Sequence, residues 1–214
     1  MAERSAEFVS DSSVKREKGS QVGGRGVRVG GRQEIIAAAA KLFANKGFAA
    51  TSMRNIAAAA GMTASSLYYH FESKEELFIA VHAAGVRSLI EAVNHRLQSL
   101  TDPWERLEAA AAAHVEALFE SADLMVLLMP RFPDGIRTHR DELIKQRDAY
   151  EKIIRHLVAD LKLREDIDRE VFRLHFIGAL NWTQTWYRPG FRLTADEIGR
   201  QLVRMLRPSQ MGPY

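Results

Sequence analysis

Apolar residues recur every three or four positions along most of the chain, which is the spacing of one face of an α-helix. The clearest case is Val86, Ile90, Val93, Leu97 and Leu100, at intervals of four, three, four and three residues. No segment alternates apolar and polar residues as a half-buried strand does, so we expect an all-α fold. The predicted helices, in chain order, cover residues 33–46, 51–60, 63–70, 74–100, 103–120, 137–163, 168–187 and 194–206.

Short polar residues stand at the predicted helix starts, where a side-chain oxygen can accept a hydrogen bond from a free backbone amide. Two of these starts pair a Ser or Thr with a glutamate three residues later, as in a capping box. Glycine at a helix end is favoured because it adopts the left-handed conformation without strain. We expect N-caps at Thr51, Thr63 and Asp102, capping boxes at Ser73–Glu76 and Thr194–Glu197, and ends at Gly47 and Gly61.

Residues 51–70 predict two short helices joined by a tight turn, which is the helix-turn-helix arrangement of DNA-binding proteins. The second helix begins with small residues, as close approach to DNA requires, and Leu67 and Phe71 are expected to anchor it. Adjacent residues on a helix point in different directions, so a core does not need three neighbouring ring side chains. Their hydroxyl and imidazole groups can instead reach phosphates and base edges. The predicted DNA contacts are Thr63, Ala64, Ser65, Ser66, Tyr68, Tyr69, His70 and, as a phosphate ligand at the next helix start, Lys74.

These residues carry a resemblance to a known family. The stretch RQEIIAAAAKLFANKGFAATSMRNIAAAAGMTASSLYYHFESKEELF resembles the N-terminal domain of TetR-type transcriptional regulators. The resemblance implies an all-helical homodimer of about nine helices per subunit, whose larger C-terminal domain binds a small molecule and releases double-stranded DNA. It adds Thr51 to the DNA-facing residues. Many relatives carry Lys or Arg early in the recognition helix, where this chain has Ala64.

The excess positive charge lies near the start of the chain. Residues 1–32 hold seven Lys or Arg against four acids, a balance of +3, which equals the net charge of all 214 residues. Residues 1–31 are glycine-rich and lack apolar periodicity, so they predict a disordered basic arm. Arg25 and Arg28 are placed to follow the DNA backbone or enter the minor groove. The arm precedes a DNA-binding domain over 32–78 and a ligand-binding and dimerisation domain over 79–214.

The helix over 168–187 is apolar on more than one side, and we expect it to form the dimer interface together with 194–206. Aromatic and methionine side chains of the second domain suit an adaptable apolar pocket, although each is also typical of ordinary core. A histidine on an apolar stripe, such as His114, is more often a core residue with its hydrogen bonds satisfied than a ligand contact. The candidate pocket residues are Leu89, Val93, Trp104, His114, Leu118, Met125, Met129, Phe132, Arg147, Tyr150, Phe176 and Trp182.

Two ligand classes remain open. Arginines at 131, 137, 140 and 147 favour an anionic, apolar ligand such as an acyl-CoA. The closing segment NWTQTWYRPGFRLTADEIGRQLV is similar to the C-terminal helices of TetR members that govern fatty-acid and steroid catabolism. Alternatively, Glu116 and Glu120 would serve a regulator of multidrug type that senses apolar cations.

Other functions are less well supported. Cysteine is absent, histidines lack the spacing of a metal-binding helix, and no phosphate-binding or nucleophile motif appears, so we expect no enzyme, metal or cofactor. A DNA-binding architectural protein without an effector stays possible, but does not need a neutral, aromatic-rich second domain. No apolar run reads as a signal peptide or membrane span, which favours the cytoplasm.

Overall fold

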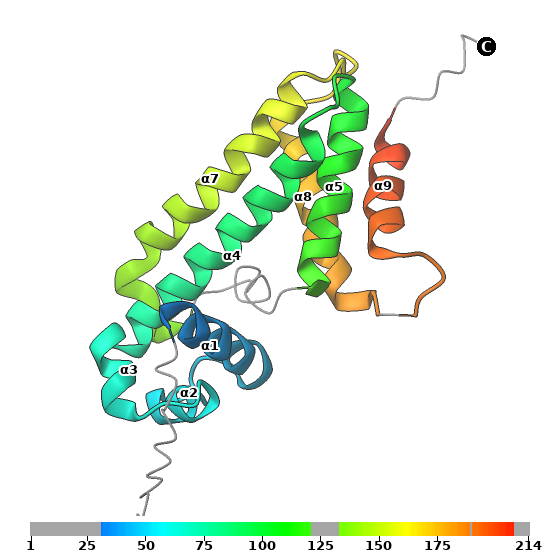
Figure 1. Ribbon diagram of the computed structural model, residues 1–214. Helices are drawn as coiled ribbons and strands as arrows, with labels where there is room; N and C mark the ends of the chain where they lie inside the picture. Colours follow the sequence, from blue (N-terminus) through cyan, green and yellow to red (C-terminus); the bar gives the residue numbers. More distant parts are fainter. Residues whose placement is uncertain (1–30, 121–132, 189, 208–214) are drawn as a thin grey trace, which may run out of the picture.

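The computed structural model describes residues 31–120, 133–188 and 190–207. All regular elements in these ranges are helices, and no strand occurs among them, so the predicted all-α class is confirmed (Figure 1). In chain order the elements are α1 (Arg32–Lys46), α2 (Met53–Ala59), α3 (Ala64–His70), α4 (Lys74–Leu97), α5 (Pro103–Glu120), the 3-10 helix η1 (Asp134–His139), α7 (Arg140–Ala159), α8 (Arg169–Trp186) and α9 (Ala195–Leu206).

Two apolar cores lie at opposite ends of the long helix α4. Helix α1 packs on α4 and is joined by α2 and α3 at the N-terminal end of α4, whereas α5 and α7 pack along α4 and α9 packs on α5 (Figure 1). The first core also takes in Ile136 of η1 and Leu143 of α7, both fully buried. A segment far from the N-terminus therefore completes the core of the predicted DNA-binding region, which extends beyond residue 78.

The helix boundaries follow the predicted caps with two corrections. Thr63, Asp102 and Thr194 cap α3, α5 and α9 as predicted. The N-cap of α2 is Ser52 rather than Thr51, because Asn55 completes a capping box with Ser52. At α4, Ser73 accepts the amide of Glu76, but the Glu76 carboxylate accepts from the amide of Glu72 instead of Ser73. Gly47 and Gly61 end their helices with positive φ, as predicted.

The predicted helix over 137–163 is shorter than expected. Its first residues belong to η1, and α7 ends at Ala159, where the amide of Asp160 donates to the carbonyls of the last turn. Residues 137–139, which the apolar periodicity assigned to one long α-helix, therefore belong to the 3-10 helix η1 that follows Pro133.

The close packing of α9 on α5 closes the second core. A Cβ placed on Gly199 would lie 2.5 Å from the carbonyl oxygen of Ala111, so only glycine allows the two backbones to approach this closely. Around this contact Arg96 of α4 bridges Glu116 of α5 and Asp196 of α9. Small residues and ion pairs together hold three helices in register.

Candidate nucleic-acid interface and effector core

Helix α3 presents its side chains in the manner that a recognition helix requires. Leu67 within it and Phe71 at its C-cap are fully buried and anchor it to the first core, as predicted. Tyr69 is 87 % exposed and Tyr68 is 52 % exposed, although aromatic side chains of this size usually bury much of their area. The ring of His70 packs edge-on against Tyr69 at 5.4 Å. Two phenol groups are thus free to meet a partner in solution.

The start of α3 is ordered by its own hydroxyl groups. Thr63 accepts the amide of Ser66 at 3.1 Å, and its hydroxyl lies 2.9 Å from that of Ser66. Ser65 and Thr63 are exposed, while Ala64 and Ser66 are half-buried. These small side chains leave the first turn of α3 open to close approach by a DNA backbone.

A hollow of about 550 Å³ lies beside α3 on the same side of the molecule. Arg54 of α2 lines it together with Tyr68 and Lys74, and Arg54 is exposed. The sequence prediction missed Arg54. The available signal was that it is the one Lys or Arg between Lys46 and Lys74.

Two residues expected to face DNA are held by the protein itself. Thr51 is 1 % exposed, and its hydroxyl donates to the carbonyl of Gly47 at 2.8 Å. This burial corrects the expectation that Thr51 faces DNA. The ammonium of Lys74 donates to the carbonyls of Phe48 and Thr51 at 2.8 and 2.9 Å. The predicted arm residues Arg25 and Arg28 lie outside the described residues.

A chain of three polar side chains crosses the second core. The hydroxyl of Tyr150 on α7 lies 2.7 Å from Nδ1 of His114 on α5, and Nε2 of His114 lies 3.1 Å from Oδ1 of Asn181 on α8. Because the amide oxygen can only accept, Nε2 carries the ring proton, and Nδ1 accepts from Tyr150. Burial lowers the pKa of His114 to about 4, so the ring is neutral at pH 7. Asn181 is half-buried, and its role was missed by sequence.

Apart from Arg147, the other expected pocket residues divide into three groups. Leu89, Val93, Trp104, Leu118 and Phe176 are buried in the second core. Trp182 is 66 % exposed on α8, which corrects the expectation that it forms a pocket wall. Met125, Met129 and Phe132 lie outside the described residues, as does the arginine at position 131.

Arg147 stands apart from the apolar wall residues because it is a half-buried cation on α7. Burial lowers its pKa, and the carboxylates of Glu151 and Asp148 oppose that effect. It also lies close enough to the buried His82 of α4 to help lower the pKa of that ring. The α4–α7 boundary thus holds a positive charge with limited access to water.

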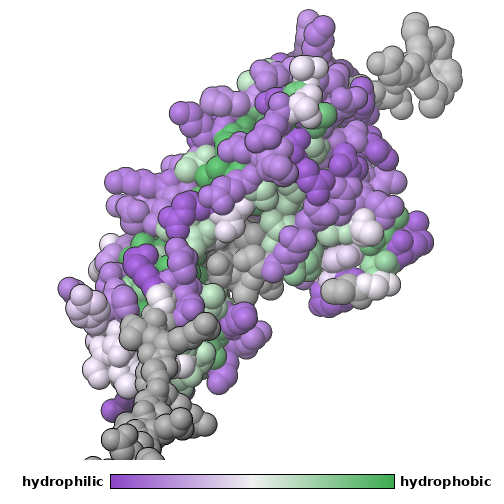
Figure 2. All heavy atoms as spheres, in the orientation of Figure 1, coloured by the Kyte–Doolittle hydropathy of each residue, from purple (hydrophilic) through white to green (hydrophobic). Residues whose placement is uncertain are grey.

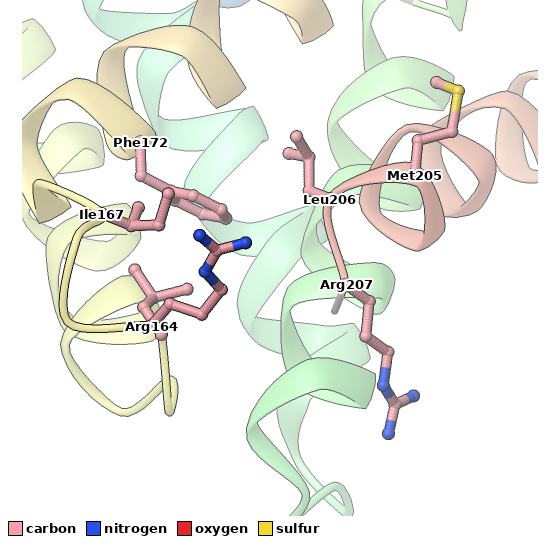
Figure 3. A pocket seen from close by; sticks show the side chains of 7 residues that line it. Arg164, Ile167, Phe172, Met205, Leu206 and Arg207 are labelled. Carbon is pink, nitrogen blue, oxygen red and sulfur yellow. The ribbon is translucent and has the colours of Figure 1, made fainter. Parts of the chain in front are cut away.

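A cavity of about 460 Å³ lies elsewhere, between the turn that joins α7 to α8 and the end of α9 (Figure 3). Phe172 and Leu206 contribute apolar walls, and the guanidinium of Arg164 reaches into the space between them (Figure 3). Arg164 is paired with Asp166 at 2.5 Å. None of the lining residues was predicted as an effector contact.

The sequence matches two family models. Residues 35–81 match the bacterial regulatory proteins of the tetR family, and residues 100–209 match the tetracyclin repressor-like C-terminal domain. Together these matches cover more than half of the chain. The chain belongs to the TetR family. The predicted resemblance is therefore confirmed, and TetR-family proteins are transcriptional regulators rather than enzymes.

Individual relatives match this TetR-family chain over about half or over more than three quarters of its length. The transcriptional repressor KstR2 of Mycolicibacterium smegmatis is 32 % identical over 186 residues, covering 82 % of this chain and 88 % of the relative. The transcriptional activator FasR of the same organism is 38 % identical over 102 residues, covering 48 % and 45 %. The crystal structure of AibR with isovaleryl coenzyme A and operator DNA superposes with a TM-score of 0.69 at 26 % identity, covering 81 % of this chain and 96 % of AibR.

The likeness supports a ligand-responsive, DNA-binding regulator, and the matched residues 35–81 include α3. No helix of the described residues is long and apolar enough to cross a membrane. Hydrophilic residues predominate on the face shown in Figure 2, with smaller apolar patches between them.

Proposed function

We propose that this TetR-family chain is a cytoplasmic repressor that leaves a two-fold operator when an acyl-CoA binds. The observation that supports an acyl-CoA as the effector is the likeness to AibR, whose crystal structure contains isovaleryl coenzyme A and operator DNA together. The similarity to the repressor KstR2 supports repression. Because the activator FasR is also similar, a separate measurement has to decide between repression and activation.

The charges of the second domain favour an anionic effector over a cationic one. Glu116, one of the two acids considered for a drug-sensing pocket, forms an ion pair with Arg96. Glu108 is 8 % exposed and is paired with Arg204. Arg147 is a half-buried cation at the edge of the core, where an anionic ligand group meets little competition from water. We propose Arg147 as the effector's anion contact.

The buried polar chain gives the proposed pocket a means of orienting a carbonyl group. His114 fixes which way the Asn181 amide faces, because its N–H needs the amide oxygen. The NH₂ group of Asn181 is thereby directed away from His114. We propose that this half-buried donor meets the thioester carbonyl of the effector, with Tyr150 and His114 as its supports.

The proposed dimer interface is the outward face of α8 with part of α9. Val171, Leu174 and Trp182 of α8 are between 57 and 66 % exposed, and Met205 of α9 is 72 % exposed. Gly178 stands among them with open space where a side chain would be. These residues suit burial against the same helices of a second subunit, as the two-fold symmetry of a dimer requires.

The test measures binding to duplex DNA from upstream of the chain's own gene by fluorescence anisotropy. The added probes are isovaleryl-CoA, longer acyl-CoAs, free CoA, the matching fatty acids and apolar cations. Release by an acyl-CoA alone supports the proposal. Release by the cations alone supports a regulator of multidrug type, and sequence-independent binding with no response supports an architectural protein.

Two further experiments, one with protein variants and one with ligand analogues, test the proposed effector contacts. Arg147→Gln is expected to weaken acyl-CoA release at least tenfold, whereas Arg155→Gln, on the exposed side of the same helix, is expected to change it little. A thioether analogue of the active acyl-CoA lacks the carbonyl and should release DNA less well than the thioester. Equal potency of the two compounds would remove Asn181 from the proposed site while leaving the acyl-CoA assignment intact.

A further inference from the structure

We infer that Lys74 is a positioning residue, which ties the start of α4 to the loop between α1 and α2 and so holds the recognition unit in place. In this role it acts through the loop and not through a phosphate. The inference does not depend on the identity of the effector.

The contacts of Lys74 are directed at the protein backbone. Its ammonium donates to the carbonyls of Phe48 and Thr51, which belong to the loop 47–52, at 2.8 and 2.9 Å. The same ammonium lies 4.2 Å from the centre of the Phe48 ring, within the range of a cation–π contact. A single side chain of α4 thus contacts three groups of a loop more than twenty residues earlier in the sequence.

This geometry is poorly suited to a phosphate ligand. A lysine ammonium has three donors, and two of them are used by the loop carbonyls. The two carbonyl oxygens also place negative partial charge directly beside the ammonium. The first turn of α4 also carries the carboxylates of Glu75 and Glu76, and Glu76 already binds the amide of Glu72. These carboxylates place negative charge at the start of α4, where it opposes the binding of a phosphate.

The loop that Lys74 holds is stiff and leads directly into the DNA-binding helices. The hydroxyl of Thr51 donates to the carbonyl of Gly47, and the amide of Thr51 donates to that of Phe48 at 3.2 Å. Ser52, the last loop residue, is the N-cap of α2. A displacement of α4 at Lys74 is consequently transmitted to α2 and, through the tight turn at Gly61, to α3.

The ring of Phe48 packs against several elements that surround the loop. Its ring packs against Phe43 of α1 at 5.5 Å and against Phe78 of α4 at 5.3 Å. A Cβ on Gly135 of η1 would lie 3.3 Å from the edge of the same ring. Phe48 therefore contacts α1 and α4 and lies directly beside η1, and Lys74 fixes its carbonyl end.

The first experiment separates a phosphate ligand from a positioning residue by salt dependence. Loss of one phosphate contact lowers the slope of log K against log salt by about 0.9. On a random-sequence duplex, Lys74→Gln is expected to leave the slope of the wild-type protein unchanged. Arg54→Gln, which removes an exposed cation from the same hollow, is expected to lower it by about 0.9. A drop of that size for Lys74→Gln would overturn the inference.

A charge-preserving variant adds a second criterion. Arg is always charged, so Lys74→Arg keeps any long-range attraction to DNA, but its larger, planar guanidinium changes the size and shape of the group that meets the two carbonyls and the Phe48 ring. The inference predicts that Lys74→Arg loses affinity for upstream promoter DNA at least as strongly as Lys74→Gln. Near wild-type binding by Lys74→Arg, with weak binding by Lys74→Gln, would show that the charge alone matters.

The last experiment measures position directly. The chain contains no cysteine, so a spin label on Ser65→Cys reports the distance between the two recognition helices of the dimer without background labelling. A label on Arg87→Cys, exposed on α4, serves as the reference. Lys74→Gln is expected to broaden the Ser65 distance distribution and to leave that of Arg87 unchanged. An unchanged Ser65 distribution in the folded variant would contradict a positioning role.

Discussion

The two cores of this molecule differ in what they bury. The core around α1, α2 and α3 is built from apolar side chains, with Thr51 as its buried polar residue. The core around α5 encloses His114 and is bordered by the buried polar or charged residues Glu108, Arg173 and Thr183. Apolar burial alone suffices to fix a scaffold, whereas buried polar groups cost free energy unless paired. Their concentration in one half marks that half as the place where a ligand can be recognised.

Helix α4 joins the two cores, and its buried His82 lies at the boundary between them. Nδ1 of His82 is 2.7 Å from the side-chain oxygen of Gln146 on α7. Leu77, Phe78 and Val81 belong to the first core, while Leu89 and Val93 belong to the second. A change in the second core thus has a direct mechanical route to the first.

The largest expected effect tests whether the two cores unfold separately. Phe71→Ala and Phe176→Ala each remove a fully buried ring from one core and should lower the free energy of unfolding by about 3–5 kcal/mol. All three tryptophans lie in the second half, so their fluorescence reports that half alone. We expect Phe71→Ala to shift the urea transition seen by circular dichroism more than the one seen by tryptophan. Identical shifts would show one cooperative unit and remove the distinction.

The second largest expected effect is a pH dependence of the stability, which arises from His114 in the second core and His82 at its boundary. Burial lowers the pKa of both His114 and His82 to about 4. Between an ordinary pKa of about 6.5 and this value, the unfolded chain takes up protons that the folded chain excludes, so stability falls as pH falls. From pH 7.5 to pH 5 the loss should be about 2 kcal/mol per histidine.

Urea titrations of the wild-type protein and of His114→Gln at both pH values check this expectation. The variant should lose about half of the pH dependence. A wild-type stability that is equal at pH 7.5 and pH 5 would mean that neither ring is excluded from protonation.

A smaller difference separates an enclosed ion pair from an exposed one. Arg173, 6 % exposed by its side chain, bridges Glu151 and Glu170, and these carboxylates raise its pKa. Arg173→Gln should cost about 2 kcal/mol because charge-assisted hydrogen bonds are lost. Arg164→Gln should have no measurable effect, since its pair with Asp166 is exposed. Thermal unfolding of both variants decides the matter, and equal melting temperatures would contradict the distinction.

The smallest expected effect compares helix caps in the two halves. Thr63→Ala and Thr194→Ala each remove an N-cap hydroxyl, which should cost about 1 kcal/mol of stability. Only Thr63→Ala should also weaken DNA binding, because it loosens the start of α3. Anisotropy with a fixed duplex measures this, and a similar loss for Thr194→Ala would indicate a global effect instead.

The sequence was most informative where structure depends on near neighbours. Caps such as Thr63 and Asp102, and the anchors Leu67 and Phe71, follow from residues within one or two turns, so their prediction was confirmed. Thr51 and Ser52 show the limit of this approach, because two adjacent hydroxyl residues compete for one cap. Asn55, three residues after Ser52, decides the choice.

Contacts between distant segments were beyond a periodicity argument. Lys74 faces loop carbonyls more than twenty residues away, and Asn181 meets His114 across 67 positions. The amphipathic pattern of α8 also placed Trp182 on an apolar stripe without saying whether that stripe faces inward or outward. Such choices depend on which helices pack together, and the side-chain spacing within one helix does not specify that.

The glycine contact between α5 and α9 also bears on how the chain is made. During synthesis the alanine-rich surface of α5 leaves the ribosome long before Gly199 exists to cover it. The second half can therefore close only near the end of translation, whereas the buried residues of the first core, in the described part of the chain, all lie at or before Leu143. The newborn chain carries a nearly complete DNA-binding core while its regulatory half is still open, and in that interval the uncovered helix is where a chaperone or a second nascent chain would attach.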